Sequence, residues 1–168
     1  MTLPDFDIRR LHDAHDYRSI RLEALLDAPE AFGSVHAVEV DRPLAHFAER
    51  LISSVVFAAY VGTQIVGMIG LKQEEGPKDF HKAFVWGFYV RPECRKHGVG
   101  RALIAALVDA ANDIVEQLTL TVVRQNTSAI ALYEACGFVT YGIEPRSLKE
   151  AAGYSDEVMM VRFLRQAT

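Results

Sequence analysis

Residues 95–103, RKHGVGRAL, combine basic side chains with two glycines at the point where an apolar, helix-like run begins. A helix N-terminus leaves about four backbone N–H groups without partners and carries roughly half a positive charge. An anion placed there satisfies both features. Gly98 and Gly100 keep bulky side chains away and permit positive φ, so that successive amides can turn inward. This stretch therefore predicts a phosphate-binding turn.

The side chains of Arg95, Lys96 and Arg101 add positive charge to the turn, and His97 is a further donor. An arginine can bind phosphate oxygens through two parallel hydrogen bonds. Two common phosphate loops are excluded, because no Lys-Ser or Lys-Thr pair follows the second glycine and because the dinucleotide fingerprint needs a third glycine. A basic turn that caps a helix without any ligand is the alternative interpretation.

The composition restricts the kind of protein in which this turn lies. The chain has 168 residues, of which 50% are hydrophobic, and a net charge of −4. This length predicts a single domain over residues 1–168. An acidic balance argues against a general nucleic-acid-binding protein. Cys94 and Cys136 are too few for a disulfide framework or a zinc site, so we expect free thiols and no metal.

No membrane or export signal is evident. The chain has no uncharged apolar run approaching the roughly 20 residues that span a bilayer. Its first ten residues lack the apolar core of a signal peptide. We therefore expect a cytoplasmic protein without a membrane partner.

Apolar periodicity predicts the elements that position the turn. Strands are expected at 5–11, 55–61, 65–73, 81–90 and 118–123, and two closing strands at 139–143 and 156–164 enclose a loop at 144–155. Helices are expected at 14–28 behind the cap Asp13, at 43–53 from Pro43, through the apolar stripe 103–111, and at 126–136 between the cap Asn126 and the stop Gly137. This order indicates a mixed sheet covered by helices.

Two stretches resemble signatures of the GNAT superfamily, the acyl-CoA-dependent N-acyltransferases. FYVRPECRKHGVGRALI matches the Arg/Gln-x-x-Gly-x-Gly/Ala signature, with Arg95, Gly98 and Gly100 at its fixed positions. NTSAIALYEACGF resembles the second signature, and the order of elements is also that of the family. The resemblance covers nearly the whole chain. It implies an α/β (α+β) fold with a mixed, mostly antiparallel central sheet of about six or seven strands, flanked by about four helices.

The resemblance also implies acetyl-CoA as cosubstrate. The backbone of residues 88–90 would pair with the pantetheine arm like an added strand, and the turn amides would hold the diphosphate. Tyr133 would be the general acid that protonates the departing thiolate, the alternative being a core aromatic. Asn126 would contact the cofactor arm, the alternative being that it only caps a helix. The implied cofactor-binding residues are Phe88, Tyr89, Val90, Arg95, Lys96, His97, Gly98, Val99, Gly100, Arg101, Asn126, Ala129 and Tyr133.

The general base is the incomplete part of the pattern. Many relatives carry a glutamate on the strand before the turn, whereas residues 81–90 contain no acid. The candidate bases are Glu39, Asp156 and Glu157. Because side chains alternate along a strand, one of the last two should face the acceptor cleft. Solvated carboxylates, or a water relayed by backbone carbonyls, are the alternatives.

The sequence thus predicts an N-acetyltransferase that moves an acetyl group from acetyl-CoA to a primary amine of a small molecule or peptide, by direct attack in a ternary complex. A non-catalytic acyl-CoA-binding or regulatory module is one alternative, and a nucleotide-phosphate binder of another class is a second. No nucleic-acid partner is expected, and the resemblance allows a homodimer.

Overall fold

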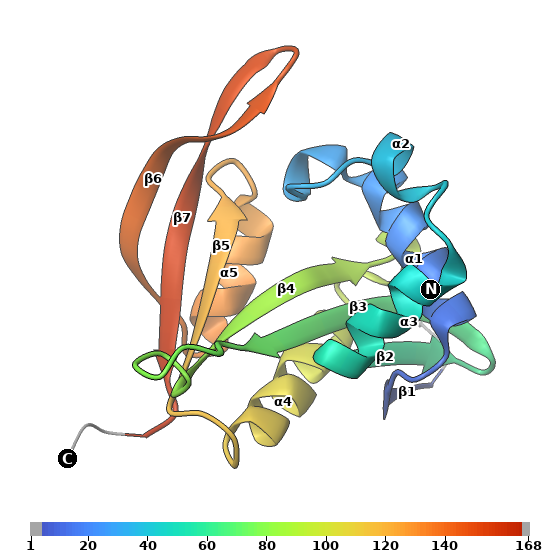
Figure 1. Ribbon diagram of the computed structural model, residues 1–168, viewed down its shortest axis with the longest axis horizontal. Helices are drawn as coiled ribbons and strands as arrows, with labels where there is room; N and C mark the ends of the chain where they lie inside the picture. Colours follow the sequence, from blue (N-terminus) through green and yellow to red (C-terminus); the bar gives the residue numbers. More distant parts are fainter. Residues whose placement is uncertain (1–4, 166–168) are drawn as a thin grey trace. The chain divides into compact units, whose positions relative to one another are not determined.

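The computed structural model describes residues 5–165 (Figure 1). The expectation that no signal peptide is present rests partly on residues 1–4, which lie outside the described residues, as do residues 166–168. In chain order the elements are β1 (Phe6–Arg10), α1 (Ala14–Asp27), η1 (Pro29–Ala31), α2 (His36–Glu39), α3 (Leu44–Ser53), β2 (Val55–Val61), β3 (Gln64–Gln73), β4 (Lys82–Val90), η2 (Pro92–Cys94), α4 (Val99–Ala111), β5 (Gln117–Val123), α5 (Thr127–Ala135), β6 (Val139–Glu150) and β7 (Gly153–Phe163).

The seven strands follow the sheet order β1-β2-β3-β4-β5-β7-β6. The first residues of β4 pair in parallel with β5, whereas the β1–β2, β2–β3, β5–β7 and β6–β7 pairs are antiparallel. The expected fold class, a mixed and mostly antiparallel sheet with flanking helices, is therefore confirmed.

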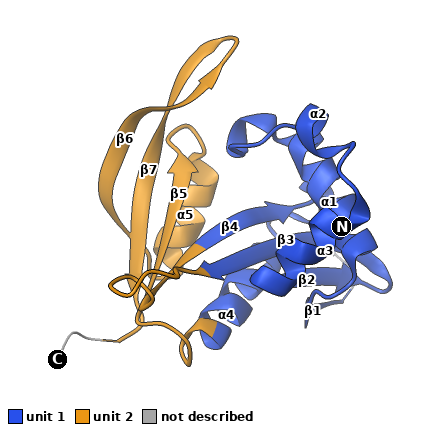
Figure 2. Cartoon of the chain, viewed as in Figure 1, with its two compact units in different colours: residues 1–72, 85–110 blue, residues 73–84, 111–168 orange. Residues whose placement is uncertain are grey.

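The chain divides into two compact units (Figure 2). Unit 1 comprises residues 1–72 and 85–110, and unit 2 comprises residues 73–84 and 111–168. Strand β4 begins in unit 2 and ends in unit 1. The single domain expected over residues 1–168 stays a prediction.

In unit 1, helices cover both faces of the strands (Figure 1). Tyr17 of α1 and Phe47 of α3 are fully buried in a core that includes Met68 of β3. The neighbouring Gly67 points to the opposite face, because successive strand residues alternate. A Cβ added there would lie 3.2 Å from a side-chain methyl of Leu103, so α4 packs closely on that face.

In unit 2, β5 contributes buried residues at every second position, Leu118, Leu120 and Val122. This alternation is typical of a strand with one face in a core. Tyr133 of α5 contacts Phe138 edge-on, with ring centroids 5.6 Å apart.

One expected element differs from the structure. Residues 144–155, expected as a loop, mostly continue β6 and β7 as a long hairpin. Pro145 lies in this segment, and proline cannot donate to a strand ladder. The structure accommodates it at a register shift between Glu144 and Leu148, in the strand that ends the sheet order. Proline is tolerated at such bulges and edges.

Among residues 5–165, no helix combines the length and the apolar composition that crossing a bilayer requires.

Candidate functional site

The predicted phosphate-binding turn connects η2 to α4 in unit 1. Its backbone is tightly wound: Lys96 has a φ of +63° and Gly98 a φ of +87°. The Ala102 amide donates to the Gly98 carbonyl at 3.0 Å, which starts the helical bonding of α4. Within the described residues, no backbone carbonyl accepts a hydrogen bond from the amides of residues 96–101. These amides are available to an anion.

The surface of the turn is open. Lys96, His97, Gly98 and Arg101 are exposed, and only Val99, 1% exposed, is anchored in the core. A Cβ built on Gly98 would meet no atom within 4 Å. The turn therefore offers unpartnered amides, positive charge and open space, which together fit a diphosphate.

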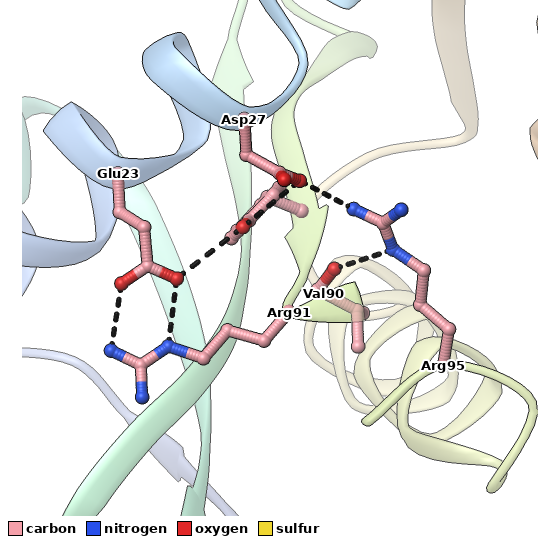
Figure 3. A network of polar contacts seen from close by, with 6 residues as sticks. Glu23, Asp27, Val90, Arg91 and Arg95 are labelled. Atoms are coloured by element: carbon pink, nitrogen blue, oxygen red, sulfur yellow. Dashed lines mark hydrogen bonds and ion pairs between the residues drawn. The ribbon is translucent and has the colours of Figure 1, made fainter. Parts of the chain in front are cut away.

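Arg95 has a different surrounding from the one expected. Its Nε donates to the Val90 carbonyl and its Nη2 donates to the Asp27 carboxylate, both at 2.8 Å (Figure 3). The guanidinium is thus held by the protein itself, rather than directed away as a freely available phosphate ligand.

Helix α1, which carries Asp27, also binds a second arginine. Arg91 donates two hydrogen bonds to the Glu23 carboxylate, at 2.8 and 2.7 Å (Figure 3). Tyr89 donates from its hydroxyl toward both Glu23 and Asp27, at 3.3 and 3.2 Å. Burial, together with these two carboxylates, raises the pKa of the Tyr89 phenol. The Tyr89 side chain is therefore part of this polar network, and only its backbone is left for a cofactor.

In unit 2, the second signature forms the start of α5. Asn126 is the N-cap: its side-chain oxygen accepts from the Ala129 amide at 3.3 Å and from the Ser128 hydroxyl at 3.2 Å. Tyr133, 6% exposed, lies about two turns beyond this N-cap. Burial raises the pKa of its phenol well above the ordinary value. Like an ordinary tyrosine, it is protonated at neutral pH, the state in which a general acid starts.

Glu39 is a buried structural carboxylate. It lies at the end of the short helix α2 and is 2% exposed. Arg21 donates two hydrogen bonds to it, at 3.0 and 2.8 Å, and Arg50 lies 3.5 Å away. Burial disfavours the charge, but the hydrogen bonds and charges of these arginines lower the pKa of Glu39 to about 2. A carboxylate so firmly ionised is a weak proton acceptor, which disfavours the base role.

The other two candidate bases lie on β7. Asp156 accepts from the Arg146 amide at 2.9 Å and pairs with Arg124 at 3.5 Å. Glu157 accepts from the Ser147 hydroxyl at 2.5 Å. Among the described ion pairs, Glu157 has no arginine partner. Its carboxylate is therefore freer to accept a proton than that of Asp156, which pairs with Arg124.

The comparison with protein families decides how these features are to be interpreted. Residues 19–138 match the acetyltransferase (GNAT) family. This chain belongs to the GNAT family. The match includes the phosphate turn, Asn126 and Tyr133, but ends before β6 and β7.

Two curated relatives of this GNAT chain align with parts of it. The [ribosomal protein bS18]-alanine N-acetyltransferase of Salmonella typhimurium is 34% identical over 80 residues, 47% of the chain. An uncharacterised protein of Mycobacterium leprae is 34% identical over 108 residues, 62% of the chain. The chain spans 54% and 29% of the lengths of these two relatives.

Solved GNAT structures share the fold. YncA from Salmonella typhimurium, solved with its cofactor acetyl-CoA, superposes with a TM-score of 0.83 at 21% identity, over 98% of this chain and 96% of YncA. A GNAT acetyltransferase from Streptococcus pneumoniae gives 0.82 at 18% identity, over 95% and 99% of the two chains. These likenesses establish the fold.

The residues expected in a GNAT site fall into both units. Unit 1 holds the turn, the strand residues 88–90 and Glu39, whereas unit 2 holds Asn126, Ala129, Tyr133, Asp156 and Glu157. The sequence analysis missed Glu23 and Asp27. Their signal was present: two acids one turn apart at the C-terminal end of a helix without a basic residue in its last turn.

Proposed function

We propose that this GNAT protein transfers an acetyl group from acetyl-CoA to a primary amine of a small molecule or peptide, within a ternary complex. The main support for this proposal is the turn at residues 96–101. Its amides have no backbone acceptor within the described residues, and a Cβ on Gly98 would meet no atom within 4 Å. Acetyl-CoA supplies the acetyl group as an activated thioester. The chain's own residues bind, orient and move protons.

The turn amides are proposed to bind the diphosphate, with Lys96, His97 and Arg101 adding charge or donors. The backbone at residues 88–90 is proposed to pair with the pantetheine arm. Val99 and Gly100 are proposed to bind the cofactor as part of the same turn, and Ala129 is proposed to bind it from the start of α5 in unit 2. Holding the two substrates in one complex supplies much of the rate acceleration in reactions of this class.

Tyr133 is proposed as the general acid for the departing thiolate, because it occupies the tyrosine position of the second signature on α5 and carries a phenol that can donate a proton. Glu157 is proposed as the first-ranked base, ahead of Asp156, because the contact found for its carboxylate is a hydroxyl rather than an arginine. Glu39 ranks last because two arginines neutralise it.

A pair of glycine variants tests whether the turn at residues 96–101 binds the diphosphate. Gly98 and Gly62 both have positive φ, +87° and +60°, and a Cβ would meet nothing within 4 Å at either position. Alanine should cost about 1 kcal/mol of stability at both sites, because L-residues are strained there. Only Gly98→Ala should weaken CoA binding, by roughly tenfold or more, since its Cβ intrudes on the phosphate position. Calorimetric titration with CoA measures this difference. Equal CoA affinity in the two variants would contradict the proposal.

A non-catalytic acyl-CoA-binding module is the second candidate, favoured by the absence of any acid in β4. The two are separated by following thiol release from acetyl-CoA with a panel of amines and peptides. Tight CoA binding without turnover on any of these acceptors would support the binding module.

A further inference from the structure

The end of α1 carries two acids in a position that an isolated helix disfavours. Glu23 and Asp27 are one turn apart at its C-terminal end, and its last turn has no basic residue. Like charges four residues apart repel, and the helix dipole is negative at that end. Favourable partners must therefore come from outside α1.

Those partners are two arginines that flank η2, immediately before the phosphate turn. Glu23 binds Arg91, and Asp27 binds Arg95, although 68 residues separate the members of each pair. The Arg95 guanidinium also lies 5.8 Å from the centre of the Tyr89 ring, whose hydroxyl reaches both acids. Figure 3 shows both carboxylates engaged by arginines from the segment that leads into the turn.

The Arg95 side chain ties this network to β4. The Arg91 amide donates to the Val66 carbonyl of β3 at 2.8 Å. The Val90 carbonyl belongs to the same planar trans peptide and so points to the opposite edge. Arg95 Nε binds that carbonyl. A single guanidinium thus fastens α1 to the edge of β4 that is turned away from β3.

The residue that follows this fastening is strained. Lys96 has a φ of +63°, a left-handed conformation that non-glycine residues rarely adopt. Such a conformation persists only where the surroundings hold it. Arg95, fixed at two nitrogen atoms, is its immediate neighbour. The strained Lys96 thus lies between buried Val99, which anchors the turn in the core, and Arg95, whose side chain is held by α1 and by Val90.

We propose that Asp27 is a positioning residue for the phosphate turn: it holds Arg95 in place and thereby aims the amides of residues 96–101. The inference rests on the proposed function, since it takes the diphosphate of CoA as the ligand of the turn. Asp27 acts through Arg95 and does not touch the cofactor.

Calorimetric titration of the 168-residue chain with CoA tests the proposal. Asp27→Asn removes the charge at nearly constant size, and the dissociation constant for CoA should rise by roughly twofold to fivefold, since the ion pair is partly exposed. The same factor should appear with 3′-phospho-ADP, which carries the diphosphate but no pantetheine arm. Asp27→Glu keeps the carboxylate and should recover part of the affinity. The matched control is Asp109→Asn, an exposed acid on α4, which should bind CoA like the wild type.

A double-mutant cycle separates positioning from a general structural effect. In an Arg95→Ala background, Asp27→Asn should weaken CoA binding no further, because its only route to the ligand is gone. Arg95→Lys should show the loss as well, because one ammonium cannot replace the two guanidinium contacts. It provides a second measurement if Asp27→Asn does not fold.

Three outcomes would overturn the inference alone: unchanged CoA affinity in Asp27→Asn, tighter CoA binding, or a loss for CoA that 3′-phospho-ADP does not share. Tighter binding would mean that Asp27 competes with the diphosphate for Arg95. A wild-type chain that does not bind CoA would overturn the proposed function, and this inference with it.

Discussion

The hydroxyl of Tyr133 is the single atom group on which the proposed chemistry most depends. It is buried in unit 2, on the helix that Asn126 caps. Tyr133→Phe removes only the oxygen. If the phenol protonates the leaving thiolate, kcat should fall by about 10²-fold, the usual lower range for general acid catalysis, while the dissociation constant of acetyl-CoA stays within about twofold. Steady-state kinetics and calorimetry measure the two quantities.

The control for this variant is Tyr141→Phe, which removes the hydroxyl of an exposed tyrosine on β6. It should keep both constants. Losses of equal size in turnover and in acetyl-CoA binding for Tyr133→Phe would show that the residue only packs.

The buried carboxylate of Glu39 predicts a pH dependence of stability. Its pKa is about 2 in the folded chain, below the ordinary 4.5. The ionised form is therefore favoured by folding, and this contribution, about 3 kcal/mol, is complete above about pH 5 and is lost as the pH falls toward 2. At pH 7, Glu39→Gln should destabilise the chain by about 3 kcal/mol, because Arg21 is left buried without its partner.

Urea unfolding between pH 7 and pH 2.5 measures this effect. The stability difference between the wild type and Glu39→Gln should shrink on acidification, whereas Glu49→Gln, an exposed acid on α3, should match the wild type throughout. A difference that does not change with pH would show that Glu39 does not titrate in this range.

At the scale of elements, Gly70 of β3 leaves room for the Trp86 side chain of the neighbouring strand β4. A Cβ built on Gly70 would lie 2.5–2.9 Å from atoms of the Trp86 indole. Gly70→Ala must displace the ring, and overpacking of this kind costs about 1–3 kcal/mol. Trp86 is the only tryptophan of the chain, so its fluorescence emission reports the displacement directly. Gly62→Ala, in the β2–β3 turn, should leave the emission unchanged. An unshifted spectrum in Gly70→Ala would exclude the close packing.

Local sequence signals predicted the elements well wherever the partners were close in the chain. Asp13 caps α1 as expected, accepting from the amides of His15 and Asp16, and Asn126 caps α5. The hairpin of β6 and β7 was predicted too short: residues 144–155 contain Pro145, which a strand tolerates at an edge or a bulge, and β6 lies at the end of the sheet order. Whether a strand lies at an edge depends on pairing between distant segments.

At the scale of the whole molecule, the division into two units has a consequence for unfolding. The chain passes from one unit to the other after residues 72, 84 and 110, so neither unit is a continuous segment. Because each unit is built from two separate segments, neither unit can fold fully until the chain that runs through the other unit is also in place. We therefore expect a single two-state transition, as most single domains below about 150 residues show, for this slightly longer chain of 168 residues.

Two probes test this expectation. Trp86 fluorescence reports on unit 1, whereas far-UV circular dichroism reports on the helices and strands of both units. Denaturant curves from the two probes should coincide. Curves with separate midpoints would show two independently unfolding units and would contradict the single domain predicted over residues 1–168.

The sequence by itself determined the basic turn with its two glycines, the caps, the order of the main elements and the family, because each depends on residues near one another in the chain. Only the tertiary structure decided that Arg95 is held by Asp27, that Glu39 is enclosed by Arg21 and Arg50, and that Arg91 binds Glu23. The partners in these ion pairs are 11 to 68 positions apart. A charged side chain chooses its partner by distance and burial in space, and neither quantity is encoded in local spacing.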